Sequence, residues 1–479
     1  MNYSIIIYII GWILKLEAVF MLLPCATALI YRESEITAFL LTMAVCLAVG
    51  LPLTRKKPGK KAFYTKEGFV TAALSWVVLS VMGALPFVIS GCIPHPVDAL
   101  FETVSGFTTT GASILSDVEA LPYCMLIWRS FTHWIGGMGV VVFILTLLPL
   151  TGGYHMNLMK AESPGPSVGK LVPKVQSTAK ILYGIYIGLT LLQMILLLLG
   201  GMPLFDTICT AFGTAGTGGF GIKNDSIAGY NTYLQVVITI FMILFGVNFN
   251  FYFFLLTKKF RQAFSTEEVR YYIGIIAIAI AVITFNVRHM FGGIGHALQQ
   301  AAFQVGSIIT TTGFATTDFN QWPQVSRTIL VMLMFVGACA GSTGGGIKVS
   351  RFVILCKTVR KELHLFVHPN AVKKIKIDGK PVPHEVVRST NIFLIVYVLI
   401  FAFSVLLVGF NNYDLTTNFT AVAATLNNIG PGLELVGPAE NFGMFSYFSK
   451  GVLIFDMLAG RLEIFPLLLL FTKDTWKKF

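Results

Sequence analysis

Ten apolar stretches, most of them long enough to cross a lipid bilayer as a helix, follow one another along this chain. They lie at about 3–30, 36–53, 69–93, 124–150, 181–200, 234–257, 271–287, 328–347, 391–410 and 447–471. A transmembrane helix needs about 20 mostly apolar residues. Charged residues make up only 12% of the 479 residues, about half the fraction found in soluble domains. The sequence therefore predicts one multi-pass helical membrane domain.

Most of the basic residues lie in alternate segments between these stretches. Of the 35 Lys and Arg, 27 lie in 54–66, 151–180, 257–270, 348–388 and 473–479. The other segments, 91–126, 201–235, 289–326 and 411–446, hold ten Asp or Glu and a single Lys, Lys223. Loops on the cytoplasmic side are enriched in Lys and Arg. The pattern predicts that both termini are cytoplasmic, and it explains the net charge of +12 without a nucleic-acid partner.

Four of the polar segments repeat one another. Residues 98–111, 206–219, 300–313 and 417–430 align without gaps, and in each a polar residue stands thirteen positions before a glycine. We expect that polar residue to cap or begin a short helix. Repetition at spacings of 108, 94 and 117 residues indicates duplicated architecture. The sequence predicts four units, each a span, a short helix and a second span, around one axis, preceded by two extra spans.

The four aligned glycines, and the glycine and threonine residues just before them, suit a path for cations. A cation that crosses a membrane exchanges its water for protein oxygens, and several strands can present backbone carbonyls toward one axis. Glycine permits the dihedral angles that turn successive carbonyls the same way, and it leaves no side chain in the path. The short helices would point their partly negative C-terminal ends at the same place. Ordinary outer loops with turn glycines are the alternative interpretation.

The four segments resemble a known filter signature. Residues 105–113, 216–220, 310–314 and 427–432 are similar to the four filter segments of the Trk/Ktr/HKT superfamily of potassium transporters, and residues 163–180 resemble an inner loop of its TrkH branch. The resemblance covers essentially the whole chain. It implies that potassium is the transported ion and that no cofactor is covalently bound. The filter pairs that it implies are Thr110 with Gly111, Gly218 with Gly219, Thr312 with Gly313, and Ile429 with Gly430.

The second span of the third unit contains three consecutive glycines, Gly344, Gly345 and Gly346. Each glycine costs a helix about 1 kcal/mol relative to alanine, so the helix is expected to break there. The resemblance implies that the break is an intramembrane gating loop. A helix-packing seam of small residues is the alternative.

Arg461 lies within the last apolar stretch. An arginine inside a membrane is costly and should face a cavity or a partner. The candidate partners are carbonyls near Gly344 to Gly346, Asp456 and Glu463. An arginine that extends to the inner membrane surface is the alternative.

The predicted fold is an all-α polytopic membrane protein. The expected segments are 1–66 (two N-terminal helices), 67–165, 166–265, 266–372 (which contains the gating loop) and 373–479. The resemblance implies a homodimer in a bacterial cytoplasmic (inner) membrane, surrounded by lipid and controlled by a cytoplasmic, nucleotide-binding subunit of the TrkA type. The function that it implies is that of a potassium channel or a potassium symporter. The other functions considered are a membrane subunit of a potassium-pumping ATPase and a membrane-embedded enzyme, although no H-E-x-x-H motif is present.

Overall fold

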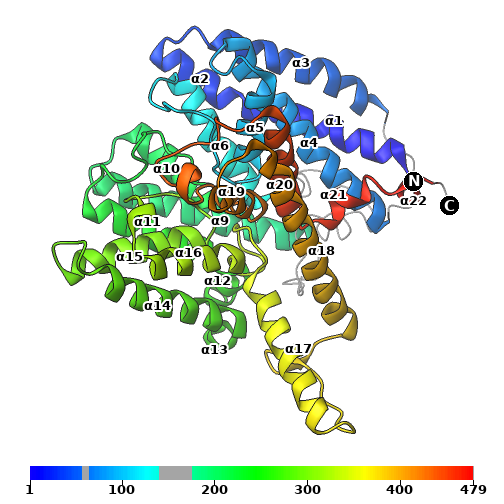
Figure 1. Ribbon diagram of the computed structural model, residues 1–479. Helices are drawn as coiled ribbons and strands as arrows, with labels where there is room; N and C mark the ends of the chain where they lie inside the picture. The colour runs from blue at the N-terminus through cyan, green and yellow to red at the C-terminus, as the bar shows by residue number, and fades with distance from the viewer. Residues whose placement is uncertain (57–63, 140–174, 478–479) are drawn as a thin grey trace.

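The structure, a computed structural model, describes residues 1–56, 64–139 and 175–477. Within these residues the chain is built almost entirely from helices (Figure 1). One two-stranded antiparallel hairpin, β1 (Lys376–Ile377) with β2 (Lys380–Pro381), is present among them. The fold is therefore the predicted all-α polytopic membrane protein. The predicted inner loop at 163–180 lies mostly outside the described residues, as does most of the basic segment at 54–66.

Two N-terminal hairpin arms precede the repeated units. The first arm is α1 (Tyr3–Phe20) continued by α2 (Leu22–Tyr31), and the second is α3 (Ile36–Arg55). Gly11 and Gly50 let the arms approach closely, because a Cβ built on Gly50 would lie 2.9 Å from the carbonyl oxygen of Gly11. Small residues of this kind allow tight packing of helices inside membranes.

The first helix of each repeated unit is long and apolar. These helices are α4 (Thr65–Ser90), α9 (Val175–Leu199), α14 (Glu267–Val287) and α18 (His384–Val408). Together with the two N-terminal arms they account for six helices that are long and apolar enough to cross a membrane. The chain is thus a multi-pass membrane protein.

The short helices of the units are α5 (Pro96–Phe107), α10 (Leu204–Gly216), α15 (Ile294–Ile309) and α19 (Leu415–Leu426). The prediction that each begins or is capped at the aligned polar residue is wrong. Asp98 and Asp206 lie inside the first turn, and Gln300 lies in the middle of α15. Two of these helices instead begin around a proline, Pro96 or Pro203, whose fixed φ suits a helix start.

The second helices are shorter than the apolar stretches predicted. They are α6 (Tyr123–Met138), α11 (Thr232–Phe245), α16 (Gln324–Val336) and α20 (Tyr447–Arg461). The expectation of one break, in the third unit, is therefore incomplete. In the second unit α12 (Phe249–Leu256) follows α11 at an angle of 93°, and Gly139 and Gly337 end α6 and α16 with positive φ.

The remaining helices of the described residues lead toward the expected cytoplasmic side. They are α13 (Phe260–Ser265), α17 (Val349–Val367), α21 (Phe465–Leu469) and α22 (Lys473–Trp476). The part of the chain that the structure describes also has single 3-10 turns at Phe319–Gln321, Gly409–Asn411 and Glu434–Val436. Figure 1 shows α17 extending away from the helical body, and it shows the two termini close together.

Packing between units closes a ring. The second helix of each unit packs against the short helix of the next: α6 against α10, α11 against α15, α16 against α19, and α20 against α5. Four units related in this way surround a common axis. The short helices and the segments that follow them are thereby brought to the centre of the protein.

Candidate ion-conduction site

The backbone takes the same unusual shape in all four central segments. The aligned glycines have positive φ angles: 79° at Gly111, 74° at Gly219, 85° at Gly313 and 99° at Gly430. The residue two positions earlier is also left-handed, with φ of 56° at Thr109, 54° at Thr217, 59° at Thr311 and 55° at Asn428. Non-glycine residues rarely adopt this conformation, and such strain concentrates at functional sites.

Each short helix ends with the same hydrogen bonds. The N–H of the residue before the glycine donates to the carbonyl five positions earlier: Thr110 to Ser105 at 2.9 Å, Gly218 to Gly213 at 2.9 Å, Thr312 to Ser307 at 2.8 Å, and Ile429 to Ala424 at 2.8 Å. With the left-handed residue in between, this is the Schellman helix ending. We call the extended segment after each short helix a strand. The repeated ending fixes the direction in which each strand leaves its helix.

The four strands then form a closed ring. A Cβ atom built on each glycine would overlap or crowd a carbonyl oxygen of the next unit: Gly111 that of Gly218, Gly219 that of Thr312, Gly313 that of Ile429, and Gly430 that of Thr110. The order of the contacts runs through units one, two, three and four and returns to one. Residues with side chains cannot replace these glycines without moving the ring.

A cavity, which we call the mouth cavity, opens beside this ring. All four glycines, Gly111, Gly219, Gly313 and Gly430, line it, together with residues that follow them in the first, second and fourth strands. Backbone that is irregular at membrane depth is tolerated where it lines a cavity or is buried in protein. The ring and its mouth thus have the form of a narrow passage lined by backbone.

The third unit places a loop against the other end of the ring. Residues 337–348, which we call the loop, are not helical and join α16 to α17. Gly337 and Gly346 have φ of 72° and 73°. The N–H of Gly345 donates to the Thr311 hydroxyl at 2.6 Å. The loop therefore contacts a residue that precedes a ring glycine, whereas the mouth cavity is lined by residues that follow the glycines.

Arg461 joins this loop to two other units. Its guanidinium donates to the carbonyl of Thr343 in the loop at 2.9 Å and to the hydroxyl of Thr109 at 3.3 Å. It also donates to the carbonyl of Gly137 at 2.9 Å and to that of Gly136. The loop contact is made at the residue just before the predicted Gly344–Gly346. One arginine thus connects the first, third and fourth units beside the ring.

The two acidic residues proposed as partners of Arg461 have contacts of their own. Glu463 forms an ion pair with Arg351 on α17. Asp456, which is fully buried, accepts a hydrogen bond from the Ser404 hydroxyl at 2.7 Å. These contacts tie α20 and the segment after it to α17 and α18.

Comparison with known proteins agrees with this architecture. The profile of the TrkH family, described as cation transport protein, matches residues 35–478. The chain belongs to the TrkH family. It is 38% identical to the Trk system potassium uptake protein TrkH of Salmonella typhimurium, over the full length of both proteins. It is 34% identical to the Trk system potassium uptake protein TrkG of Escherichia coli, over 99% of this chain and 98% of that protein.

A solved structure shares the fold. The crystal structure of the potassium transporter TrkH from Vibrio parahaemolyticus matches with a TM-score of 0.89 and 36% sequence identity, and all of both chains is covered. The TrkH family is a family of transport proteins rather than of enzymes.

Two charged residues outside the predicted site of this TrkH-family chain also form hydrogen bonds with the loop backbone. The buried carboxylate of Glu268 accepts from the N–H of Ala340 at 2.6 Å and from that of Ser350 at 3.1 Å. The Lys348 amine donates to the carbonyl of Gly344. Lys348 lies two positions after the glycine run, which is a signal in the sequence. Glu268 is 72 residues from Ala340 in the chain, and no local pattern indicates it.

Proposed function

We propose that this protein takes up potassium ions across a bacterial cytoplasmic membrane, with the ring of four strands as its selectivity filter. The observation that most supports this proposal is the closed ring, in which each glycine lies against a carbonyl of the next unit. Rings of backbone carbonyls replace the hydration shell of a cation. The filter residues are Thr110, Gly111, Gly218, Gly219, Thr312, Gly313, Ile429 and Gly430. The names of the relatives, potassium uptake proteins, support potassium as the ion.

The loop and Arg461 are the proposed gate. The loop contacts Thr311 next to the filter, and Arg461 joins its Thr343 carbonyl to the first unit. While these contacts hold, the loop stays at the end of the filter. Opening would consist of moving Gly344, Gly345 and Gly346 aside, and the lack of side chains at these positions makes such a movement easier.

Control from the cytoplasm completes the proposal. The relatives are named as proteins of a Trk system, which supports a separate regulatory subunit of the TrkA type that binds nucleotide. The helix α17, which is buried at its start and more exposed toward its C-terminal end, follows the loop directly, so a force on α17 would reach the gate. We further propose a homodimer with both termini in the cytoplasm.

Ion flux into proteoliposomes tests the filter. Purified protein should admit potassium in preference to sodium, and Gly111→Ser should lower that preference because a side chain there would overlap the Gly218 carbonyl. Gly91→Ser is a matched control: Gly91 has a similar φ of 76° but open space around it. An unchanged preference in Gly111→Ser, with Gly91→Ser also unchanged, would contradict the assignment of the filter.

A further inference from the structure

The second filter strand lacks the threonines that brace two of the others. In the first strand the hydroxyls of Thr108 and Thr110 are 2.8 Å apart, and in the third those of Thr310 and Thr312 are 2.7 Å apart. Both pairs stand one and three positions before the filter glycine. The second strand has glycine at both places, Gly216 and Gly218. Its support must come from elsewhere.

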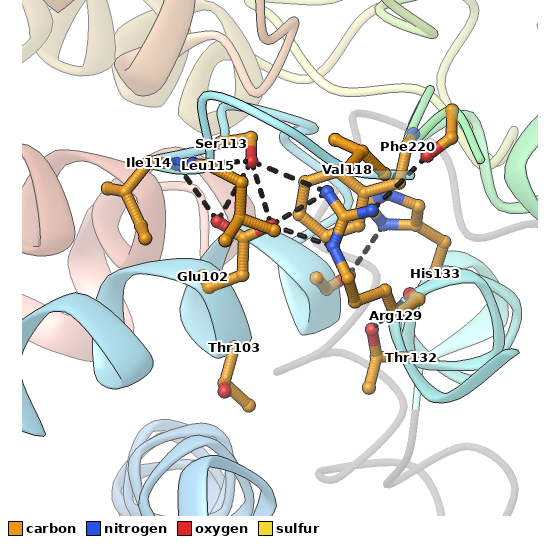
Figure 2. Close-up of polar contacts among 12 residues, drawn as sticks. Glu102, Thr103, Ser113, Ile114, Leu115, Val118, Arg129, Thr132, His133 and Phe220 are labelled. Atoms are coloured by element: carbon orange, nitrogen blue, oxygen red, sulfur yellow. Dashed lines mark hydrogen bonds and ion pairs between the residues drawn. The ribbon is translucent and has the colours of Figure 1, made fainter. Parts of the chain in front are cut away.

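The imidazole of His133 occupies the space beside Gly218. A Cβ atom built on Gly218 would overlap the His133 ring, so the ring stands where the other strands carry a side chain. His133 lies on α6 of the first unit and is fully buried. Its Nδ1 is 2.7 Å from the carbonyl oxygen of Gly106, and its Nε2 is 3.2 Å from the backbone nitrogen of Phe220. Figure 2 shows the ring between α6 and the strand that carries Phe220.

These two partners determine the protonation of the ring. The carbonyl of Gly106 can only accept, so Nδ1 carries the proton; the N–H of Phe220 can only donate, so Nε2 is bare. His133 is therefore a neutral imidazole. It links the end of the short helix α5 in the first unit to the residue that directly follows Gly219 in the second.

Arg129, one helical turn earlier on α6, contacts the same strand. Its guanidinium lies 4.1 Å from the centre of the Phe220 ring and donates to the carbonyl of Gly221 at 3.2 Å. Arg129 is held in turn by an ion pair of 2.7 Å with Glu102, and both side chains are buried (Figure 2). The first unit thus holds the second strand on both sides of Phe220.

From this geometry we propose that His133 is a positioning residue of the filter: it fixes the second strand and thereby the preference for potassium over sodium. The proposal rests on the filter function proposed above. His133 acts through Gly218 and Phe220, because it contacts the backbone behind the filter rather than the ion path. Loss of its hydrogen bonds would let the Gly218 carbonyl shift relative to Gly111.

Two substitutions separate hydrogen bonding from bulk. His133→Phe keeps a ring of similar size but has neither donor nor acceptor, whereas His133→Gln retains one of each. Potassium and sodium uptake would be measured in proteoliposomes made from one preparation of each variant. We expect the potassium-to-sodium uptake ratio to fall about tenfold in His133→Phe, a loss of ~1.4 kcal/mol of discrimination. The ratio of His133→Gln should stay within about twofold of the native one.

Trp134→Phe is the matched control. Trp134 is the next residue of α6, and its indole N–H donates to the Thr190 hydroxyl at 3.4 Å, away from the filter. A substitution that only destabilises α6, whether His133→Phe or Trp134→Phe, would reduce the yield of folded protein but leave the uptake ratio unchanged. If His133→Phe does not fold, His133→Asn replaces it, because the shorter amide can reach Gly106 but not Phe220, and the same tenfold fall is expected.

Two results would overturn the proposal: a native uptake ratio in the folded variant used, whether His133→Phe or His133→Asn, or an equal fall in His133→Gln. Gly111→Ser, measured in the same assay, distinguishes this failure from failure of the filter itself. If Gly111→Ser alters the ratio and the His133 variants do not, the filter stands and the positioning role falls. If neither alters it, the filter assignment fails.

Discussion

Replacing Arg461 by alanine tests the proposed gate most directly. The guanidinium donates to Thr343 in the loop, to Thr109 beside the filter, and to the carbonyls of Gly136 and Gly137 at the end of α6. Among these acceptors the Thr343 carbonyl belongs to the loop, the part that moves in the proposed gating. Arg461→Ala removes this contact and leaves the filter glycines unchanged. We therefore expect higher basal potassium flux with an unaltered ion preference.

The size of the effect follows from the contact between Arg461 and Thr343. A hydrogen bond to a charged group contributes about 1.5–3 kcal/mol. If the contact is made only in the closed state, its loss shifts the balance between closed and open forms by about ten- to hundredfold. The Gly345 bond to Thr311 and the Ala340 bond to Glu268 remain, so the loop should be destabilised rather than released. Deletion of Gly344 to Gly346 should have a larger effect in the same direction.

Rubidium or potassium uptake into proteoliposomes, without any regulatory protein, measures the basal rate. Arg327→Ala is the control, because Arg327 pairs with Glu434 at a partly exposed site on the other face of the ring. Size-exclusion chromatography would establish that each variant is folded. If Arg461→Ala and the deletion both fold and conduct at the native basal rate, the loop is only a packing seam and the gate lies elsewhere.

Three further predictions concern topology, the loop and the support of the filter. A cysteine at Asp117 should react with an impermeant thiol reagent from outside intact cells and one at Lys374 should not; the reverse pattern would overturn the proposed orientation. Glu268→Gln should raise basal flux about fivefold, because a neutral amide accepts more weakly from the N–H of Ala340 in the loop and that of Ser350 at the start of α17, a loss of ~1 kcal/mol; native flux in folded protein would contradict this. Glu102→Gln should lower the stability of the fold by about 3–5 kcal/mol in detergent unfolding, because it leaves Arg129 buried and unpaired; an unchanged midpoint would argue against that role.

The membrane fold could be predicted because its signals are local and repeated. Apolar length determines which segments span, and the four aligned glycines indicate four units around an axis. The breaks in the second helices could not all be predicted. Apolar composition continues through Gly139 and Gly246, so the stretch looks continuous, whereas the run of three glycines at Gly344–Gly346 is visible. The division of the chain into five segments stays a prediction.

The starts of the short helices differ from the prediction for a related reason. The aligned polar residues repeat at a fixed distance from the glycine, but helix length varies from 12 residues in α5 to 16 in α15. The ring requires a common C-terminal end, since the strands must meet. Nothing requires a common beginning, so Gln300 lies well inside its helix while Asp98 lies in the first turn.

The same distinction explains why the positioning residues are invisible in the sequence. The ring imposes one backbone shape on four strands, and that shape leaves a repeated pattern of glycine and left-handed residues. The support behind each strand can be of any kind that fills the space. Threonine pairs support the first and third, His133 supports the second, and in the fourth the Asn428 amide donates to Thr110 and to the carbonyl of Met457. Repetition therefore identifies where carbonyls must lie, and only the three-dimensional contacts identify what holds them there.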